Sequence, residues 1–78
     1  EALHAAVARR GVRLDARSQL LFRGRDFYIN GEHVRVAPAL APALSSLADN
    51  RRLAGQAMSP ALSALLHPWY LAGYLGPA

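Results

Sequence analysis

The sequence predicts a small α+β domain in which a three-stranded antiparallel β-meander is followed by a helical segment. Turns centred on Gly24-Arg25 and Asn30-Gly31 divide residues 19–36 into three short segments. Asn-Gly between alternating residues is the strongest short-range signal of a hairpin, because a type I′ turn needs positive φ at both central positions. After this stretch the leucines change to helical spacing. The 78 residues allow a single domain.

The segment ahead of the meander is predicted to be helical. Residues 1–10 have a thin apolar face at helical spacing, and Gly11 supplies a stop signal. Residues 12–17 are expected to be a connector into the sheet. We interpret residues 1–17 as an N-terminal helix and connector that lead in from a parent chain. The opening at Glu1, without an initiator methionine, also leads us to expect a piece of a larger protein.

The two-residue turns determine the register of the meander. The first turn pairs Phe22 with Phe27, and the second pairs Phe27 with Val34. Because side chains alternate across a strand, one face is predicted to be the core face. It carries Leu20, Phe22, Phe27, Ile29, Val34 and Val36. The opposite face carries two cross-strand rows, one of Arg23, Asp26 and Arg35 and one of Leu21, Tyr28 and His33.

The outer face of the meander offers a candidate working surface. The row that holds Asp26 places a carboxylate between two guanidiniums, which is typical of surface pairing that contributes about 0–1 kcal/mol per exposed pair. We interpret His33 beside Tyr28 as surface packing in preference to a metal or catalytic role. The row of Leu21, Tyr28 and His33 is therefore the candidate protein interface.

A first helix is predicted directly after the meander. Pro38 and Pro42 lie where a helix can begin, since proline is tolerated in the first turn. Leucines then follow at spacings of four and three, and Asp49-Asn50 closes the element. Residues 51–58 are expected to form one irregular helical turn or a short helix.

The last predicted helix has the clearest start signal. Ser59 is a favourable N-cap, and Pro60 suits the first helical position. The apolar face that follows is made of Leu62, Leu65, Leu66 and Trp69. Pro68 is expected to kink or divide the helix, because it removes a backbone donor and clashes with the preceding turn. Gly73 and Gly76-Pro77 are expected to end it.

A helix, a short helix and a longer helix joined to a hairpin suggest a winged-helix-like domain over residues 18–78. The longest helix would be the recognition helix of such a domain. Residues 60–78 contain no arginine or lysine, however, and neutralisation of phosphates supplies most of the affinity of a DNA-binding protein. This helix is therefore poorly suited to bind DNA. The hairpin also precedes the helices, whereas a DNA-binding wing follows the recognition helix. Nucleic-acid binding or regulation stays an alternative, with candidate phosphate contacts at Arg9, Arg10, Arg51 and Arg52.

Composition excludes several classes of protein. The absence of cysteine excludes a disulfide framework and a thiolate zinc site. The most apolar run, residues 60–78, is broken by prolines and glycines, so we predict no membrane span, no signal peptide and a cytoplasmic location. The net charge of +4 comes from scattered arginines, which we interpret mainly as solvated or paired surface charge. A hydrophobic content of 53% in so short a chain predicts that some apolar surface packs on something outside this chain.

No catalytic constellation is visible in the sequence. The histidines, His4, His33 and His67, fall on three different predicted elements, so a shared metal is not indicated. The serines lack an identifiable His-Asp partner. We predict no catalytic, cofactor-binding or metal-binding residue. The pair Trp69-Tyr70 fits core packing, an interface with a parent chain or a ligand contact, and we count both residues as candidate interface.

Three segments in order resemble a known family: FYINGE (residues 27–32), LSSLADNRRL (44–53) and WYLAGYL (69–75). The chain resembles the C-terminal winged-helix domain of bacterial JmjC/cupin-type ribosomal oxygenases over about residues 18–76. The resemblance implies a parent enzyme that uses Fe(II) and 2-oxoglutarate to hydroxylate an arginine of a ribosomal protein. Pro68, inside a segment that is helical in the family, and the basic charge depart from the family pattern.

The resemblance implies a non-catalytic accessory domain that supports architecture or positions a protein substrate. The family's iron and 2-oxoglutarate ligands belong to a cupin barrel, so no catalytic residue carries over to this chain. The implied partners are the rest of the parent chain and its ribosomal protein substrate, and a homodimer formed through the parent stays open. Capture of an extended peptide at a sheet edge is a third alternative.

Overall fold

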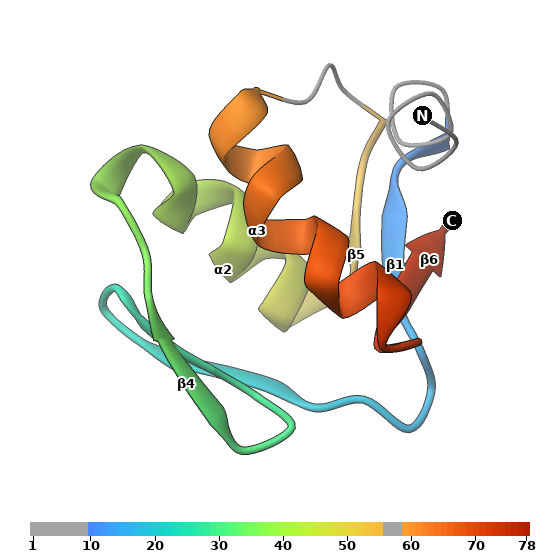
Figure 1. The fold of residues 1–78 in the computed structure, drawn as a ribbon, viewed down its shortest axis with the longest axis horizontal. Coiled ribbons are helices and arrows are strands. Elements are labelled where there is room, and N and C mark those ends of the chain that lie inside the picture. The colour runs from blue at the N-terminus through green and yellow to red at the C-terminus, as the bar shows by residue number, and fades with distance from the viewer. Residues whose placement is uncertain (1–9, 56–58) are drawn as a thin grey trace.

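The described residues of the computed structural model, 10–55 and 59–78, form two three-stranded antiparallel sheets and two α-helices (Figure 1). This arrangement confirms the predicted α+β fold class. The first helix that was predicted, residues 1–10, lies outside the described residues except at its last position. The elements in chain order are β1 (Val12–Leu14), β2 (Leu20–Arg23), β3 (Asp26–Ile29), β4 (Glu32–Arg35), the 3₁₀ helix η1 (Pro38–Leu40), α2 (Ala41–Asn50), β5 (Arg52–Leu53), α3 (Pro60–Leu71) and β6 (Leu75–Pro77).

The β2-β3-β4 sheet is the predicted meander, and its register is confirmed pair by pair. Phe27 lies opposite Phe22 on one side and opposite Val34 on the other. Asn30 and Gly31 have φ values of 48° and 88°, the two positive angles that a type I′ turn needs. The Asn30 side chain also accepts a hydrogen bond from the Gln19 N–H at 2.8 Å, which extends the pairing of β2 with the turn.

A second sheet, in the order β5-β1-β6, was not predicted. Residues 12–17 were expected to be a connector, but Val12–Leu14 form a strand. Residues 51–58 were expected to be helical, but Arg52–Leu53 form a strand. The last strand, Leu75–Pro77, follows the end of α3. Strands of two or three residues are too short to show a period. Tertiary pairing stabilises them: β1 lies between the other two strands, and the Ala78 N–H extends the ladder to the Gly11 carbonyl at 3.0 Å.

The helix α3 begins as predicted but is not divided by its proline. The Ser59 hydroxyl accepts a hydrogen bond from the Leu62 N–H at 3.1 Å, and the helix continues through Pro68 to Leu71. Proline removes the donor that would reach the carbonyl of Ala64, which lies on the exposed side of the helix where water can satisfy that carbonyl. The helix can therefore tolerate Pro68 near its C-terminal end.

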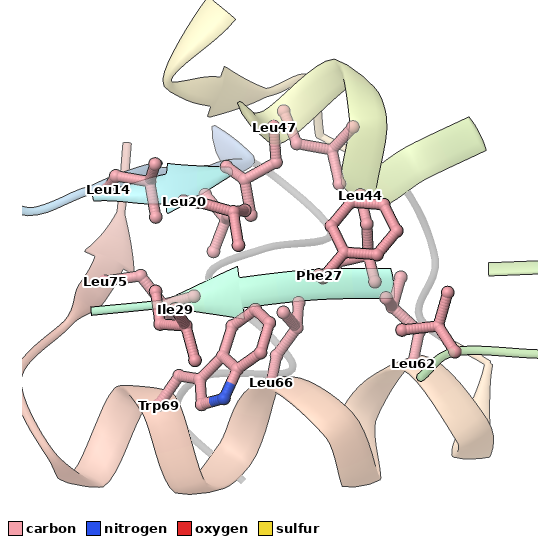
Figure 2. Close-up of a cluster of buried hydrophobic side chains, with 13 residues drawn as sticks. Leu14, Leu20, Phe27, Ile29, Leu44, Leu47, Leu62, Leu66, Trp69 and Leu75 are labelled. Atoms are coloured by element: carbon pink, nitrogen blue, oxygen red, sulfur yellow. The ribbon is translucent and has the colours of Figure 1, made fainter. Parts of the chain in front are cut away.

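The core lies between the inner face of the meander and the two helices. Figure 2 shows Leu66 and Trp69 of α3 directed at β3 from one side, while α2 contributes Leu44 from the other. Several side chains of this core are almost fully buried: Val12, Phe27, Ile29, Leu44, Leu47 and Leu66. The sheet β5-β1-β6 belongs to the same cluster through its own buried residues, Val12, Leu14, Leu53 and Leu75.

One residue of the predicted core face lies partly outside the core. Phe22 stacks on Phe27, with ring centroids 5.2 Å apart and planes 17° apart, yet it remains 38% exposed. It sits near the end of β2, an edge strand of the sheet, so one side of its ring has no neighbour to cover it. Val34 on the opposite edge strand is half-buried. On the core face, Phe22 and Val34 of the two edge strands are therefore less buried than Phe27 of the central strand, whereas Leu20 of β2 is buried.

Gly11 offers a test of how closely β1 and the segment after β5 approach one another. Its φ is +81°, and a Cβ at this position would collide with the backbone carbonyl oxygen of Leu53. We expect Gly11→Ala to lower the free energy of unfolding by about 2–4 kcal/mol, from backbone strain and the collision together. Gly24→Ala is the matched control, because Gly24 also has a positive φ, +60°, but has open space around it. This substitution should lower the free energy of unfolding by only about 1 kcal/mol. If urea unfolding showed the same loss of free energy of unfolding in both variants, the close approach of Gly11 to the Leu53 carbonyl would be contradicted.

Candidate functional site

The three residues of the predicted interface row come together on the outer face of the β2-β3-β4 sheet. Leu21 and Tyr28 are directly opposite one another on β2 and β3, and His33 is opposite Tyr28 on β4. Leu21 is 54% exposed and Tyr28 is 41% exposed. The rings of Tyr28 and His33 are 5.1 Å apart between centroids. We call these three residues the outer patch.

The outer patch is joined to the neighbouring row through Asp26. The Asp26 carboxylate is hydrogen-bonded to His33 Nε2 at 2.9 Å and accepts hydrogen bonds from Arg35 at 3.3 Å. The sequence predicted an ion pair with Arg23 on the other side, but within the described residues Asp26 pairs with His33 and Arg35. His33 reaches Asp26 diagonally across the two strands, a separation that a ring can span. The His33 hydrogen bond, followed by the charge of Arg35, lowers the pKa of the Asp26 carboxyl below 3.8.

The other two candidate interface residues lie elsewhere. Trp69 is only 7% exposed and belongs to the core, where it packs below the inner face of the meander (Figure 2). Tyr70 is half-buried, with its ring centroid 6.5 Å from that of His67 on the same helix. Trp69 lies on the inner side of the sheet, opposite the outer patch, so the five candidates do not form one continuous surface.

The arginines proposed as phosphate contacts have different surroundings. Arg9 lies outside the described residues, and Arg10 is exposed. Arg51 ends α2 in the left-handed conformation, with φ 62°, and its guanidinium donates to the carbonyls of Asp15 and Ser18, both at 2.8 Å. Arg52 is exposed on β5. Arg51 therefore ties the turn after β1 to the end of α2, whereas Arg52 is available at the surface.

Arg13 was not predicted from the sequence as a site residue. It lies on β1 directly opposite Arg52, and both line a hollow of about 560 Å³. Val12, Arg13 and Leu14 alternate apolar, charged and apolar, but three residues are too few to establish the period of a strand, so this pattern alone does not predict that Arg13 faces outward. The sequence contains no signal that β5 lies beside it.

The described residues do not fit an iron site. No three histidine, aspartate or glutamate side chains among them gather closely enough to hold a metal ion. An Fe(II) centre of the kind implied by the family resemblance needs two histidines and a carboxylate that converge on one point. In the part of the chain that the structure describes, no helix has the length and apolar character needed to cross a bilayer.

The Asp26 pairing predicts a specific dependence on pH. Because the pKa of Asp26 is lower in the folded chain than the ordinary 3.8, its ionised carboxylate stabilises the fold at pH values above 3.8. This stabilisation is lost as the pH falls through the folded-state pKa. We expect the carboxyl carbon of Asp26 to titrate below pH 3.8 by NMR, and His33→Gln to move its midpoint toward 3.8. Arg23→Gln is the matched control and should leave the midpoint unchanged. A midpoint already at 3.8 in the unsubstituted chain would contradict the pairing.

Arg51 and Arg52 are adjacent, exposed and chemically identical, yet among the described residues only the Arg51 side chain of the two donates to backbone carbonyls of another segment. We expect Arg51→Gln to lower the free energy of unfolding by about 1–2 kcal/mol, because two carbonyls lose a charged donor. Arg52→Gln should change it by no more than about 0.5 kcal/mol. Denaturant unfolding followed by circular dichroism distinguishes the two variants. Equal effects would show that the Arg51 hydrogen bonds do not hold the turn.

Comparison with known proteins provides the family assignment. The family model for the ROXA-like winged helix matches residues 1–76 of the chain. A search of curated proteins and a search of solved structures each found no match. The matched range includes both sheets and both helices described above, and it confirms the family that the three sequence segments predicted. The chain therefore belongs to the ROXA-like winged-helix family, the winged-helix domain of ribosomal oxygenases.

Proposed function

We propose that this chain is a non-catalytic accessory domain of a JmjC/cupin-type Fe(II)- and 2-oxoglutarate-dependent oxygenase that hydroxylates a ribosomal protein. In this proposal the outer patch contacts protein, either the substrate of the parent enzyme or another part of the parent chain. Membership of the ROXA-like winged-helix family supports the identity of the parent. The single observation that supports a protein contact is the exposure of Leu21 and Tyr28 side by side on a rigid sheet.

The composition of the outer patch suits a protein partner. Leu21 and Tyr28 provide an apolar centre, and His33, Asp26 and Arg35 provide a polar edge with defined hydrogen bonds. Interfaces commonly have this organisation, with aromatic anchors at the centre and polar groups around them. The opposite side of the same strands is packed in the core, so the patch is presented with little conformational freedom. A preorganised surface loses less entropy on binding.

The described residues would not carry the oxidation themselves. They provide no set of metal ligands, so the proposal assigns Fe(II), 2-oxoglutarate and the catalytic step to the rest of the parent. What this domain contributes is binding and orientation. A contact outside the reacting centre can raise the rate by holding the substrate in place, because binding energy from remote groups is available for positioning.

The test is the double variant Tyr28→Ala/His33→Ala in the full-length parent enzyme. If the patch binds substrate, KM should rise about tenfold with kcat little changed, since a central aromatic anchor typically contributes about 1–2 kcal/mol, which is about five- to thirtyfold in affinity. If the patch instead packs on the parent, the thermal stability of the full-length enzyme should fall.

Two controls accompany this experiment. Leu71→Ala removes a side chain that is 71% exposed on α3, away from the patch, and should leave KM unchanged. Circular dichroism of the 78-residue chain should show that the double variant keeps its fold, because both substituted side chains are at the surface. Unchanged KM, kcat and stability in the double variant would reject the outer patch as a contact surface.

A further inference from the structure

A basic hollow lies on the outer face of the β5-β1-β6 sheet, remote in the fold from the outer patch. Its volume is about 560 Å³, and its lining includes Arg13, Asp15, Arg51, Arg52, Gly73 and Gly76, beside Asn50 and four apolar residues. Three of the eleven lining residues are arginines. Neither the family assignment nor the proposed protein contact gives this hollow a role.

Two of the arginines are held beside one another by the register of the sheet. Arg13 pairs with Arg52 across β1 and β5, and both are exposed, while Val12 and Leu53 on the same strands are buried. Directly opposite residues of an antiparallel pair have Cβ atoms about 4.5–5.5 Å apart, and like charges in this position are destabilising. Within the described residues neither arginine has an ion pair to offset this repulsion.

The rest of the lining offsets the two guanidinium charges only in part. Hydrogen bonds from Arg17 are the main cause that lowers the pKa of the Asp15 carboxyl, and the charge of Arg13 adds a smaller lowering. The Asp15 carboxylate already accepts hydrogen bonds from the backbone N–H of Arg17 at 3.0 Å and from its side chain at 3.2 Å. The third arginine, Arg51, uses its guanidinium to hold two backbone carbonyls, and it adds a further positive charge to the same hollow. The hollow is therefore net positive with its one lining carboxylate engaged.

The third position of the row leaves space for a ligand. Gly76 on β6 lies directly opposite Arg13, on the other side from Arg52. A Cβ added to Gly76 would meet no atom within 4 Å, so the surface beside the Arg13 guanidinium is open. An anionic oxygen can approach the backbone here beside Arg13, while Arg52 flanks Arg13 on its other side. Arginine suits this purpose, because its planar fork can donate two parallel hydrogen bonds to one phosphate.

We infer that this hollow binds the backbone phosphates of a nucleic acid, with Arg13 and Arg52 as the direct contacts. A peptide ligand would need apolar anchors for affinity. The large exposed hydrophobic residues among the described ones, Leu21, Phe22, Tyr28 and Leu71, all lie outside the lining. Phosphate contacts, in contrast, supply affinity through charge alone. This contact is independent of the proposed protein contact, because it uses a different sheet.

The test is titration of a short fluorescent oligouridylate RNA with the 78-residue chain, followed by anisotropy at several salt concentrations. Two phosphate contacts to a single strand should give a slope of log K against log salt of about −1.4. Arg13→Gln and Arg52→Gln should each weaken binding about tenfold and reduce the size of the slope by about 0.7. Arg23→Gln, which removes the same charge from an exposed position on the other sheet, is the matched control and should have little effect.

Gly76→Glu provides a variant whose folding is not in doubt. It places a carboxylate directly opposite Arg13 in open space, so it should preserve or raise the thermal unfolding midpoint while it abolishes RNA binding. Absence of RNA binding at low salt would overturn the inference. Equal loss in Arg13→Gln and Arg23→Gln would also overturn it, because binding would then follow net charge alone. Binding of a polyglutamate peptide without binding of RNA would assign the hollow to an acidic peptide instead.

Discussion

Burial of one face of β3 is the interaction on which the remaining structure depends. Phe27 and Ile29 are almost completely removed from solvent, and side chains of this size contribute about 1.5–3 kcal/mol each when fully buried. Their burial requires α2 and α3 to lie against the inner face of the meander (Figure 2). Because side chains alternate along a strand, the same packing directs Tyr28 outward. The outer patch is thus a geometric consequence of how the core is closed.

The elements that could be predicted from the sequence are those whose determinants are local. The register of the meander follows from two turns of two residues each, and the start of α3 follows from Ser59 and Pro60, because each signal acts within a few residues. The second sheet has no such determinants. Val12 pairs with Leu53 and with Pro77, so its strands exist only once distant segments have met. The prediction that Pro68 divides the helix was wrong, because the sequence alone does not indicate that the preceding helical turn is exposed to solvent.

The same distinction applies to the candidate surfaces. Leu21, Tyr28 and His33 were predicted to be neighbours because they belong to adjacent strands of a single meander. Trp69 was placed correctly on the apolar face of its helix, but its depth in the core depends on the sheet that covers it. The proximity of Arg13 and Arg52 depends entirely on the pairing of β1 with β5, which brings together two segments that are far apart in the chain.

The pairing of β1 with β6 has a mechanical consequence. The hydrogen bond between the Ala78 N–H and the Gly11 carbonyl places both ends of the described unit at the same end of one antiparallel pair. A tension applied between those ends would load the backbone hydrogen bonds of the ladder one after another. A shearing load, in contrast, would be shared by all of them at once. A pull from a flanking segment would therefore act directly on the hydrogen bonds between β1 and β6, whereas the meander has no strand in this ladder.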